Sequence, residues 1–312
     1  MRAAVLSTSD SWYFRDLRRA AVDGGAQLVA VPFESLHSGI DFRNPQTGPH
    51  LTVQSGEFNL NDFDAVIVRT MPPGSLEQVV FRMNALARLE SRGVAVVNSP
   101  RSLEAAVDKY LTTALLDEAG LATPRTYVCQ SSADAMHAFS KLGGDVVLKP
   151  IFGSEGRGIA RLQDEALAER AFRMVAQFGG VLYLQEFIAH EGFDLRLFVV
   201  GRRVLGMRRR NPHDWRTNCS RGATAEPLEV TPELAATAQR AAAAVGAELA
   251  GVDVLIGRDG TRYVVEVNAV PGWMALSKTL DVDIARLVLE HVAERAAEAR
   301  RRRGRKWANR RS

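Results

Sequence analysis

The chain has 312 residues, enough for two or three domains that each bury a hydrophobic core. Its hydrophobic fraction of 46% and charged fraction of 24% are typical of a water-soluble globular protein, and no run of eighteen apolar residues predicts a membrane span. The net charge of +4 comes from residues 300–312, which hold eight Lys or Arg and no acid. The remaining chain has 32 basic and 36 acidic residues, which argues against a folded body that binds nucleic acid.

The N-terminal segment and the cysteines suggest a cellular compartment. The apolar run after Met1 is too short for a signal peptide and predicts a first strand instead. Cys129 and Cys219 lie far apart in the sequence and fit no metal-binding spacing. We expect incidental thiols, although the polar neighbours of Cys219 leave a reactive thiol open. A reducing cytoplasm is the simplest compartment for such a chain.

Residues 1–100 alternate between predicted strands and helices, which is the pattern of a small α/β domain with a parallel sheet. Strands are predicted at residues 3–6, 27–31, 64–69 and 94–97, and helices at residues 14–23 and 76–92. Residues 36–56 show little hydrophobic periodicity and are predicted as loop or irregular strand.

The remaining chain has a mixed pattern. Helices are predicted at residues 102–116, 133–141, 167–178, 231–245 and 283–299, and strands at residues 126–129, 146–149, 181–188, 194–200 and 203–209. Asp108 and Lys109 fall inside the first of these helices. The last two strands form an antiparallel pair joined at Gly201 and Arg202, and a polar loop follows at residues 211–221.

A β-hairpin is predicted from residues 251–256 and 264–272 around a glycine-bounded turn. If Ile256 lies opposite Thr261, then Asp253 lies opposite Val264. Asp253 is then a diagonal neighbour of Glu266 on the same face of the hairpin.

Asp253, Glu266 and Asn268 therefore gather oxygen atoms on one face of this hairpin. Two carboxylates at this spacing raise each other's pKa unless a cation lies between them. Oxygen ligands of this kind suit Mg²⁺, which also takes phosphate oxygens and water. The alternative is an amphipathic hairpin with one hydrated face.

Lys149 ends the apolar strand at residues 146–149, where an anion such as a nucleotide phosphate would compensate its charge. The alternative is that the side chain reaches solvent. Gly153, Gly156 and Gly158 follow, and glycines allow backbone N–H groups to approach phosphate oxygens. On spacing alone, a mobile surface loop explains these glycines equally well.

Three further segments carry polar side chains in suggestive places. The end of the strand at residues 181–188 can hold an adenine by its backbone, or it is a plain core strand with outward polar residues. Asp194 and Arg196 share a strand face, where a cross-strand ion pair is the alternative. In the polar loop, the arginines can clamp phosphate and the amide can ligate a metal, or the loop is simply solvated. The residues concerned are Gln185, Glu186, Phe187 and Ile188 in the strand, and Arg216, Thr217, Asn218 and Arg221 in the loop.

In this order, these segments resemble the ATP-grasp superfamily and, within it, the RimK-like glutamate ligases. The resemblance runs from about residue 99 to about residue 294 and includes Pro271-Gly272 at the end of the hairpin. It implies an ATP-grasp fold of mixed α/β and α+β type, in which two α+β subdomains, residues 101–188 and 189–298, clamp ATP. Residues 1–100 resemble the small α/β domain that precedes ATP-grasp in such ligases, and residues 299–312 form a basic tail.

The resemblance also implies roles for individual residues. It assigns the ATP phosphates to Lys109, Lys149 and the loop of Gly153, Gly156 and Gly158; the adenine to Gln185, Glu186, Phe187 and Ile188; the ribose to Asp194; the triphosphate region to Arg216, Thr217 and Asn218; and two Mg²⁺ ions, for which Mn²⁺ can substitute, to Asp253, Glu266 and Asn268. Arg216 and Arg196 would stabilise anionic intermediates.

The reaction that the resemblance implies is amide formation through an acyl phosphate, with release of ADP. L-Glutamate is the expected amine donor, and the acceptor carboxylate belongs to a small molecule, such as a pterin-type cofactor, or to a protein tail. A ligase for another amino acid, or an ATP-binding module that acts only as an interaction protein, are the alternatives. The basic tail would contact an acidic partner or be a solvated extension. An oligomer is compatible with the sequence, and no membrane partner is expected.

Overall fold

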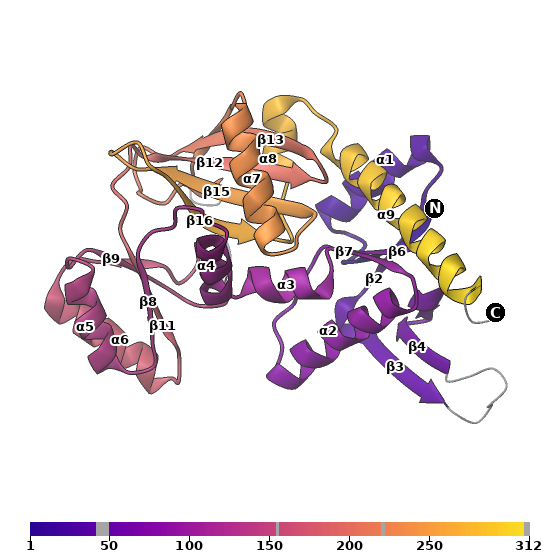
Figure 1. Cartoon of the computed structure of the whole chain (residues 1–312), viewed down its shortest axis with the longest axis horizontal. Coiled ribbons are helices and arrows are strands. Elements are labelled where there is room, and N and C mark those ends of the chain that lie inside the picture. Colours follow the sequence, from indigo (N-terminus) through magenta and orange to yellow (C-terminus); the bar gives the residue numbers. More distant parts are fainter. Residues whose placement is uncertain (42–49, 154–155, 220–221, 309–312) are drawn as a thin grey trace. The chain divides into compact units, whose positions relative to one another are not determined.

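A computed structural model describes residues 1–41, 50–153, 156–219 and 222–308 (Figure 1). Within these residues the backbone divides into two compact units. Unit 1 contains residues 1–104, residues 246–249 and the chain from Val270 onward. Unit 2 contains residues 105–245 and 250–269.

Unit 1 is built on the parallel sheet that the sequence predicts. Its strands are β1 (Arg2–Leu6), β2 (Gln27–Val31), β6 (Ala65–Val68) and β7 (Ala95–Val97), in the order β2-β1-β6-β7. All neighbouring pairs are parallel. Strands β6 and β7 are buried throughout, as expected for a sheet that helices cover.

Helices α1 (Trp12–Gly24), α2 (Leu76–Ser91) and α9 (Ile284–Ala308) pack on this sheet. Helix α9 lies beside α1 and contacts β6 and β7, although it is the last element of the chain (Figure 1). Ser75 and Gln78 form a capping box that fixes the start of α2, with each side chain bonded to the backbone of the other.

The segment predicted as loop or irregular strand forms a small antiparallel sheet of β3 (Leu36–Asp41), β4 (His50–Ser55) and β5 (Phe58–Asn59). Hydrophobic periodicity is missing because every residue of β3 after Leu36 is exposed. Two short 3₁₀ turns, η1 (Phe33–Ser35) and η2 (Leu60–Asp62), flank this sheet.

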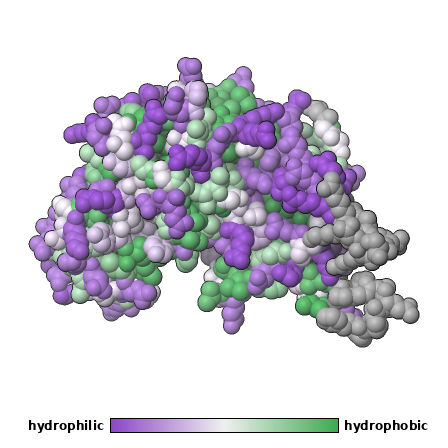
Figure 2. Space-filling view, viewed as in Figure 1, coloured by the Kyte–Doolittle hydropathy of each residue, from purple (hydrophilic) through white to green (hydrophobic). Residues whose placement is uncertain are grey.

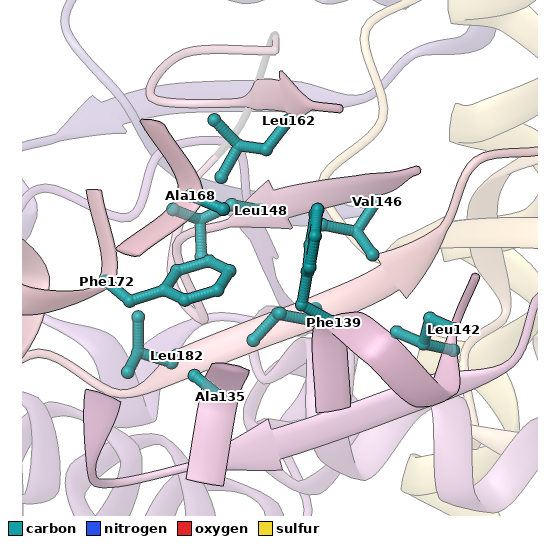
Figure 3. Packing of buried hydrophobic residues seen from close by; sticks show 10 residues of the cluster. Ala135, Phe139, Leu142, Val146, Leu148, Leu162, Ala168, Phe172 and Leu182 are labelled. Atoms are coloured by element: carbon teal, nitrogen blue, oxygen red, sulfur yellow. The ribbon is translucent and has the colours of Figure 1, made fainter. Parts of the chain in front are cut away.

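The first sheet of unit 2 has the order β10-β9-β11-β8. Its strands are β8 (Thr126–Cys129), β9 (Val146–Lys149), β10 (Ala160–Leu162) and β11 (Leu182–Glu186), and the helices α5 (Ser132–Lys141) and α6 (Glu165–Gln177) cover one face. Figure 3 shows the core between them, in which Phe139 and Phe172 of the helices meet Val146, Leu148 and Leu182 of the strands.

The second sheet of unit 2 has the order β14-β13-β12-β15-β16. Its strands are β12 (Phe193–Val200), β13 (Arg203–Arg210), β14 (Thr224–Pro227), β15 (Leu249–Ile256) and β16 (Arg262–Asn268). Helix α7 (Pro232–Ala244) packs against β12 and β13, and its N-cap Thr231 accepts a hydrogen bond from the Leu234 amide. The predicted antiparallel pair at residues 194–209 is confirmed.

One predicted helix is wrong, because residues 102–116 do not form a single helix. Helix α3 (Pro100–Val107) ends before Asp108, and α4 (Lys109–Glu118) begins after it. The Asp108 carboxylate accepts hydrogen bonds from the backbone N–H groups of Tyr110 and Leu111, so it caps a new helix instead of continuing the old one. Lys109 is thereby the first residue of a helix.

Other short elements were not predicted, because a strand or helix of a few residues carries no readable period. They are β5, β10, β14 and helix α8 (Met274–Leu280).

Helix α9 continues beyond its predicted end into the basic segment, as far as Ala308. The first part of the predicted tail is therefore helical, and Arg300 donates from Nε to Oδ1 of Asp64 at 3.1 Å. Most of the face visible in Figure 2 is hydrophilic, with hydrophobic residues in small separate groups. Among the described helices, none is long and apolar enough to cross a membrane.

Candidate functional site

A pocket with about 700 Å³ of space, part of it open to solvent, lies in unit 2 and is lined by both of its sheets. Most of the predicted site residues line it: Lys149, Gly156, residues 185–188, Asp194, residues 216–218, Asp253 and Glu266. Five predicted residues do not: Lys109, Gly153, Gly158, Arg196 and Asn268.

Strand alternation explains how the first sheet presents its polar residues to this pocket. In β9, Val146 and Leu148 face the hydrophobic core of Figure 3, so Val147 and Lys149 face the pocket. In β11, Leu184 belongs to the same core, and Gln185 faces the pocket. A core on one face of the sheet therefore fixes a lysine and an amide on the other.

Lys149 is held by its neighbour on the adjacent strand. Its Nζ donates to Oε1 of Gln185 at 2.5 Å, and the Gln185 amide donates to the hydroxyls of Thr126 at 3.1 Å and Tyr183 at 3.2 Å. Although the side chain of Lys149 keeps some exposure, desolvation lowers its pKa to about 8. An anion bound beside Lys149 would raise this pKa back towards its usual value.

Lys109 does not line the pocket but holds the glycine loop that does. Its Nζ donates to the carbonyl oxygen of Gly153 at 2.7 Å, and burial lowers its pKa. Gly156 has a φ of +68°, and a Cβ at this position would lie 2.8 Å from Oδ1 of Asn218. Glycine is thus required both by the backbone conformation and by the close approach of the polar loop.

The predicted register of the hairpin is wrong. Ile256 lies opposite Arg262, and a β-bulge between Asp253 and Val254 shifts the pairing, so that Asp253 lies directly opposite Glu266. The turn is one residue longer than assumed, with the Gly257 amide bonded to the Thr261 carbonyl. The bulge brings the two carboxylates closer than the diagonal arrangement would.

Asp253 belongs to a buried chain of ion pairs that runs across the second sheet. It accepts from Nη1 of Arg196 at 2.6 Å and lies 2.9 Å from Nη2 of Arg209. Arg209 also donates from Nε to Oδ1 of Asp194, its cross-strand partner, at 2.8 Å. The predicted alternative of a cross-strand ion pair at Asp194 is therefore confirmed.

In this chain of ion pairs, the pKa values of the two acids are shifted in opposite directions. Burial on its own would raise the pKa of Asp253, but Arg196 and Arg209 lower it below the usual value. Burial raises the pKa of Asp194, although Arg209 faces it and the Thr217 hydroxyl bonds to it. Asp253 is thus held as a carboxylate by two arginines.

Arg209 was not predicted, although the sequence contained the signal. A two-residue turn at Gly201 and Arg202 places Val200 opposite Arg203, and counting back along both strands places Asp194 opposite Arg209.

Among the described residues, no arginine forms an ion pair with Glu266. Burial and the nearby Asp253 raise its pKa, while Lys109, Arg196 and Lys149 act in the opposite direction. A cation bound beside it would compensate this carboxylate.

The donor set fits a metal that shares its ligands with a nucleotide. No group of three or more His, Cys, Asp or Glu side chains in the described residues could hold a metal alone. The hairpin offers two carboxylates and the amide of Asn268, which lies two residues beyond Glu266 and opposite Gly251. Mg²⁺ is commonly bound by one or two carboxylates together with substrate phosphates and water.

Part of the pocket lining is aromatic. Strand β11 ends at Glu186, so Phe187 and Ile188 lie beyond it. The Phe187 ring lies 5.8 Å from that of Trp215 and 6.0 Å from that of His190, centroid to centroid. Trp215 and His190 line the pocket and were not predicted, because neither occupies a position that a strand or motif marks.

Glu186 lines the pocket, but its carboxylate is already used by Arg125. It accepts from the backbone N of Arg125 at 2.8 Å and from Nε at 2.6 Å. The backbone N–H of Phe187 is also used, because it donates to the Asp145 carbonyl at 3.1 Å. A planar ligand would therefore meet the backbone beyond this N–H.

In the polar loop, Arg216 lines the pocket and pairs with Asp214 at 2.7 Å. Arg221 lies outside the described residues. The Cys219 thiol is free, and burial raises its pKa, which favours the unreactive thiol over the thiolate. The same holds for Cys129.

Comparison with known proteins yields two family models that cover most of the chain. The model for the RimK-like ATP-grasp domain matches residues 106–292, and the model for the N-terminal domain of prokaryotic glutathione synthetase matches residues 4–104.

Individual relatives match over nearly their whole length. The tetrahydromethanopterin:alpha-L-glutamate ligase of Methanosarcina acetivorans is 32% identical, with 92% of this chain and 97% of that protein covered. A probable alpha-L-glutamate ligase of Azotobacter vinelandii is 30% identical, with 95% and 96% covered. The structure of the ATP-grasp ligase PsnB with a minimal precursor, Mg and ADP matches with a TM-score of 0.72 at 20% identity, covering 95% of this chain and 97% of that one. The predicted fold, ATP-grasp preceded by a small α/β domain, is confirmed.

Proposed function

The chain belongs to the RimK-like ATP-grasp family of ligases, and from this premise we propose that it adds L-glutamate to the carboxylate of an acceptor. Two relatives named as alpha-L-glutamate ligases support glutamate as the amine donor. One of them is named for tetrahydromethanopterin, which supports a small pterin-type acceptor over a protein tail.

The single observation that carries the proposal is the meeting of Glu266, Asp253 and Lys149 in one pocket. Glu266 lies directly opposite Asp253 and has a raised pKa, so a cation beside it is favourable, and the desolvated Lys149 favours an anion. A nucleoside triphosphate with its divalent ions supplies both. We propose that the triphosphate lies between Lys149 and the hairpin.

Other residues that line the pocket provide places for the remaining parts of the nucleotide. The glycine loop, tied down by Lys109 and abutting Asn218, would direct backbone N–H groups at phosphate oxygens. The adenine would lie against Phe187, Ile188 and Trp215, and its polar edge would meet the backbone after Glu186. Asp194 and Thr217 would face the ribose side.

Asp253, Glu266 and Asn268 would hold Mg²⁺ together with phosphate oxygens. When bound, the metal offsets charge on the β- and γ-phosphates and aligns the transferred group. The protein's own contribution is to keep the Asp253 carboxylate ionised and fixed. Arg196 does this for Asp253, so we propose that it positions a ligand and does not touch the substrate.

Arg216 is the side chain we propose to stabilise the anionic intermediate. It lines the pocket, and its guanidinium is oriented by Asp214. Nothing in the proposed reaction requires a covalent nucleophile, because the acceptor carboxylate itself attacks the γ-phosphorus and the amine of glutamate then displaces phosphate. We further propose that residues 101–188 and 189–298 are the two halves that enclose ATP.

The test is a ligation assay with purified protein, Mg²⁺, ATP, L-glutamate and a panel of carboxylate acceptors that includes a pterin and glutamate-terminated peptides. We expect ADP release that depends on glutamate and on one acceptor, with a glutamate-sized mass increment on that acceptor. Replacing L-glutamate by other amino acids tests the donor. ADP release no higher than in the protein-free control, with every acceptor, would contradict the proposal.

A further inference from the structure

Two buried polar groups at the carboxyl ends of the unit 1 strands have no hydrogen-bond partner among the described residues. They are Oγ of Ser7 and Nε of Arg69. Ser7 directly follows β1, and Arg69 directly follows β6. Leu6 and Val68 are register partners in parallel strands, so Ser7 and Arg69 leave the sheet side by side.

These strand ends lie at the topological switch point of the sheet. The chain passes from β1 to β2 on one side and then returns to β6 on the other side of β1. In open parallel sheets of this kind, ligands bind beyond the carboxyl ends of the strands where the order reverses. Ser7 and Arg69, which we call the switch-point pair, stand at that place.

The guanidinium of Arg69 is buried without an anion. The residue is only 6% exposed, and Ser7 only 2%. Nη2 of Arg69 donates to the Pro271 carbonyl at 2.8 Å, and the guanidinium lies 4.3 Å from the ring of Trp273. Within the described residues no acidic side chain pairs with it, and burial lowers its pKa to about 10. A buried cation without a counter-ion is destabilising, and a bound anion would compensate its charge.

The surroundings hold Arg69 in place without neutralising it. The Tyr13 and Trp273 rings meet edge to face at 4.9 Å. The nearby carboxylate of Asp16 accepts from Nε1 of Trp273 at 2.9 Å. A Cβ on Gly272 would collide with the Tyr13 hydroxyl, so glycine is needed there for this packing.

We propose that the switch-point pair binds a carboxylate of a ligase substrate, with Arg69 as the charged donor and Ser7 as the neutral one. The inference rests on the proposed function, because both glutamate and its acceptor carry carboxylates. A single planar guanidinium beside one hydroxyl matches the two oxygens of a carboxylate. The carboxylate belongs either to the amino-acid donor or to the acceptor, and the experiment separates these sources.

The direct test is side-chain ¹⁵N NMR of the full-length protein, following the Nε–H signal of Arg69, which Arg69→Lys assigns by its loss. The probes are glutarate, L-glutamate and acetyl-Glu-Glu, with sodium chloride at equal ionic strength as the control. We expect a saturable shift of this signal with glutarate. If L-glutamate shifts the signal and the peptide does not, the site binds the amino-acid donor. If the peptide shifts it and L-glutamate does not, the site binds the acceptor. No saturable shift with any of the three, or the same shift with chloride, overturns the proposal.

Kinetics with matched variants provides the second readout. Arg69→Met is expected to raise the KM of one carboxylate substrate by about tenfold to a hundredfold and Ser7→Ala by about fivefold, while the KM of ATP stays unchanged. The control is Arg82→Met, because Arg82 is also buried, stacks on Phe33 and donates to the Pro72 carbonyl, but belongs to helix α2 and not to the switch-point pair. Equal effects of the Arg69 and Arg82 substitutions on KM would show a structural role only.

The two proposals fail in different ways. If the protein releases ADP in a glutamate-dependent reaction but the Arg69 signal ignores carboxylates, the ligase proposal stands and the switch-point site falls. If the Arg69 signal responds but no acceptor supports ADP release, the site stands and the proposed reaction falls.

Discussion

Two regions of this molecule bury charge and compensate it differently. In unit 2, Asp194, Arg209, Asp253 and Arg196 form a continuous chain of ion pairs inside a sheet. In unit 1, Arg69 contacts two aromatic rings and one carbonyl oxygen, and no acid in the described part of the chain pairs with it. Both arrangements are almost completely removed from water.

The difference indicates what each region lacks. The chain of paired charges in unit 2 is a frame, because each member is costly to remove. Its charges largely compensate one another, and Asp194 and Asp253 line the pocket as part of it. An unpaired buried cation is the reverse, since its own removal costs little and an external anion gains from meeting it. Glu266 is the unit 2 counterpart of Arg69, a half-buried acid with which no arginine pairs within the described residues.

The largest effect is expected from breaking the frame. Arg209→Met leaves Asp194 and Asp253 buried without their shared partner and should lower the free energy of unfolding by about 3–5 kcal/mol. Arg69→Met removes an unpaired charge and should change it by less than about 1 kcal/mol in either direction. Denaturant unfolding of both variants measures the contrast, and Arg208→Met is the control for the loss of a neighbouring arginine on β13. Similar losses for Arg209→Met and Arg69→Met would abolish the distinction between the two regions.

The next effect concerns Glu266, the hairpin carboxylate outside the chain of ion pairs. Glu266→Gln keeps the shape of the side chain but removes the charge that a metal needs, and turnover should fall by about a hundredfold or more. The exposed Glu226 of β14 offers a control, and Glu226→Gln should keep full activity. ADP release at saturating ATP is the measurement. Retention of activity in the Glu266 variant would mean that the metal is held elsewhere.

A smaller effect follows from the lowered pKa of Lys149. Since burial lowers it to about 8 in the free protein, the ammonium loses its proton as pH rises through 8, whereas an ordinary lysine stays charged. ATP binding should therefore weaken above pH 8, by up to about tenfold for each further pH unit. Titration of a fluorescent ATP analogue on both sides of pH 8 measures this. Lys149→Arg stays charged and should bind with no such dependence, and an identical pH profile in that variant would refute the assignment.

The smallest effect is expected in the glycine loop. Gly156→Ala introduces a Cβ at positive φ beside Asn218, with a local strain of about 1–2 kcal/mol. The KM of ATP should rise several-fold. Gly143→Ala provides a matched control, because Gly143 also has positive φ but no atom lies near its Cβ position. If both variants raise the KM of ATP equally, the contact with Asn218 has no role in nucleotide binding.

Much of the fold was readable from the sequence, because buried strands leave a strong pattern. The core of β9 and the lysine at its end are visible as one apolar run closed by a charge, and the register of β12 and β13 follows from the tight turn at Gly201. The bulge at Asp253 was not readable, since one extra residue in a strand leaves the hydrophobic pattern on either side intact.

The unpredicted parts of the site depend on tertiary structure. Trp215 reaches the pocket from a loop without periodicity, and no motif fixes its distance to Phe187. That Arg69 has no acidic partner among the described residues is even less visible in the sequence, because it depends on every neighbour in space. The basic C-terminal segment was expected to be separate from the fold, but α9 includes much of it, because its apolar face packs on the unit 1 sheet.

The central claim is that the carboxylates of the hairpin bind divalent ions only together with a nucleotide. Electron paramagnetic resonance of Mn²⁺ tests it, with and without a non-hydrolysable ATP analogue, in the native protein and in Glu266→Gln. We predict that free Mn²⁺ signal is lost on addition of protein and nucleotide together, beyond the loss with nucleotide alone, and that Glu266→Gln abolishes this difference. Equal Mn²⁺ binding in the native protein and the variant would contradict the account.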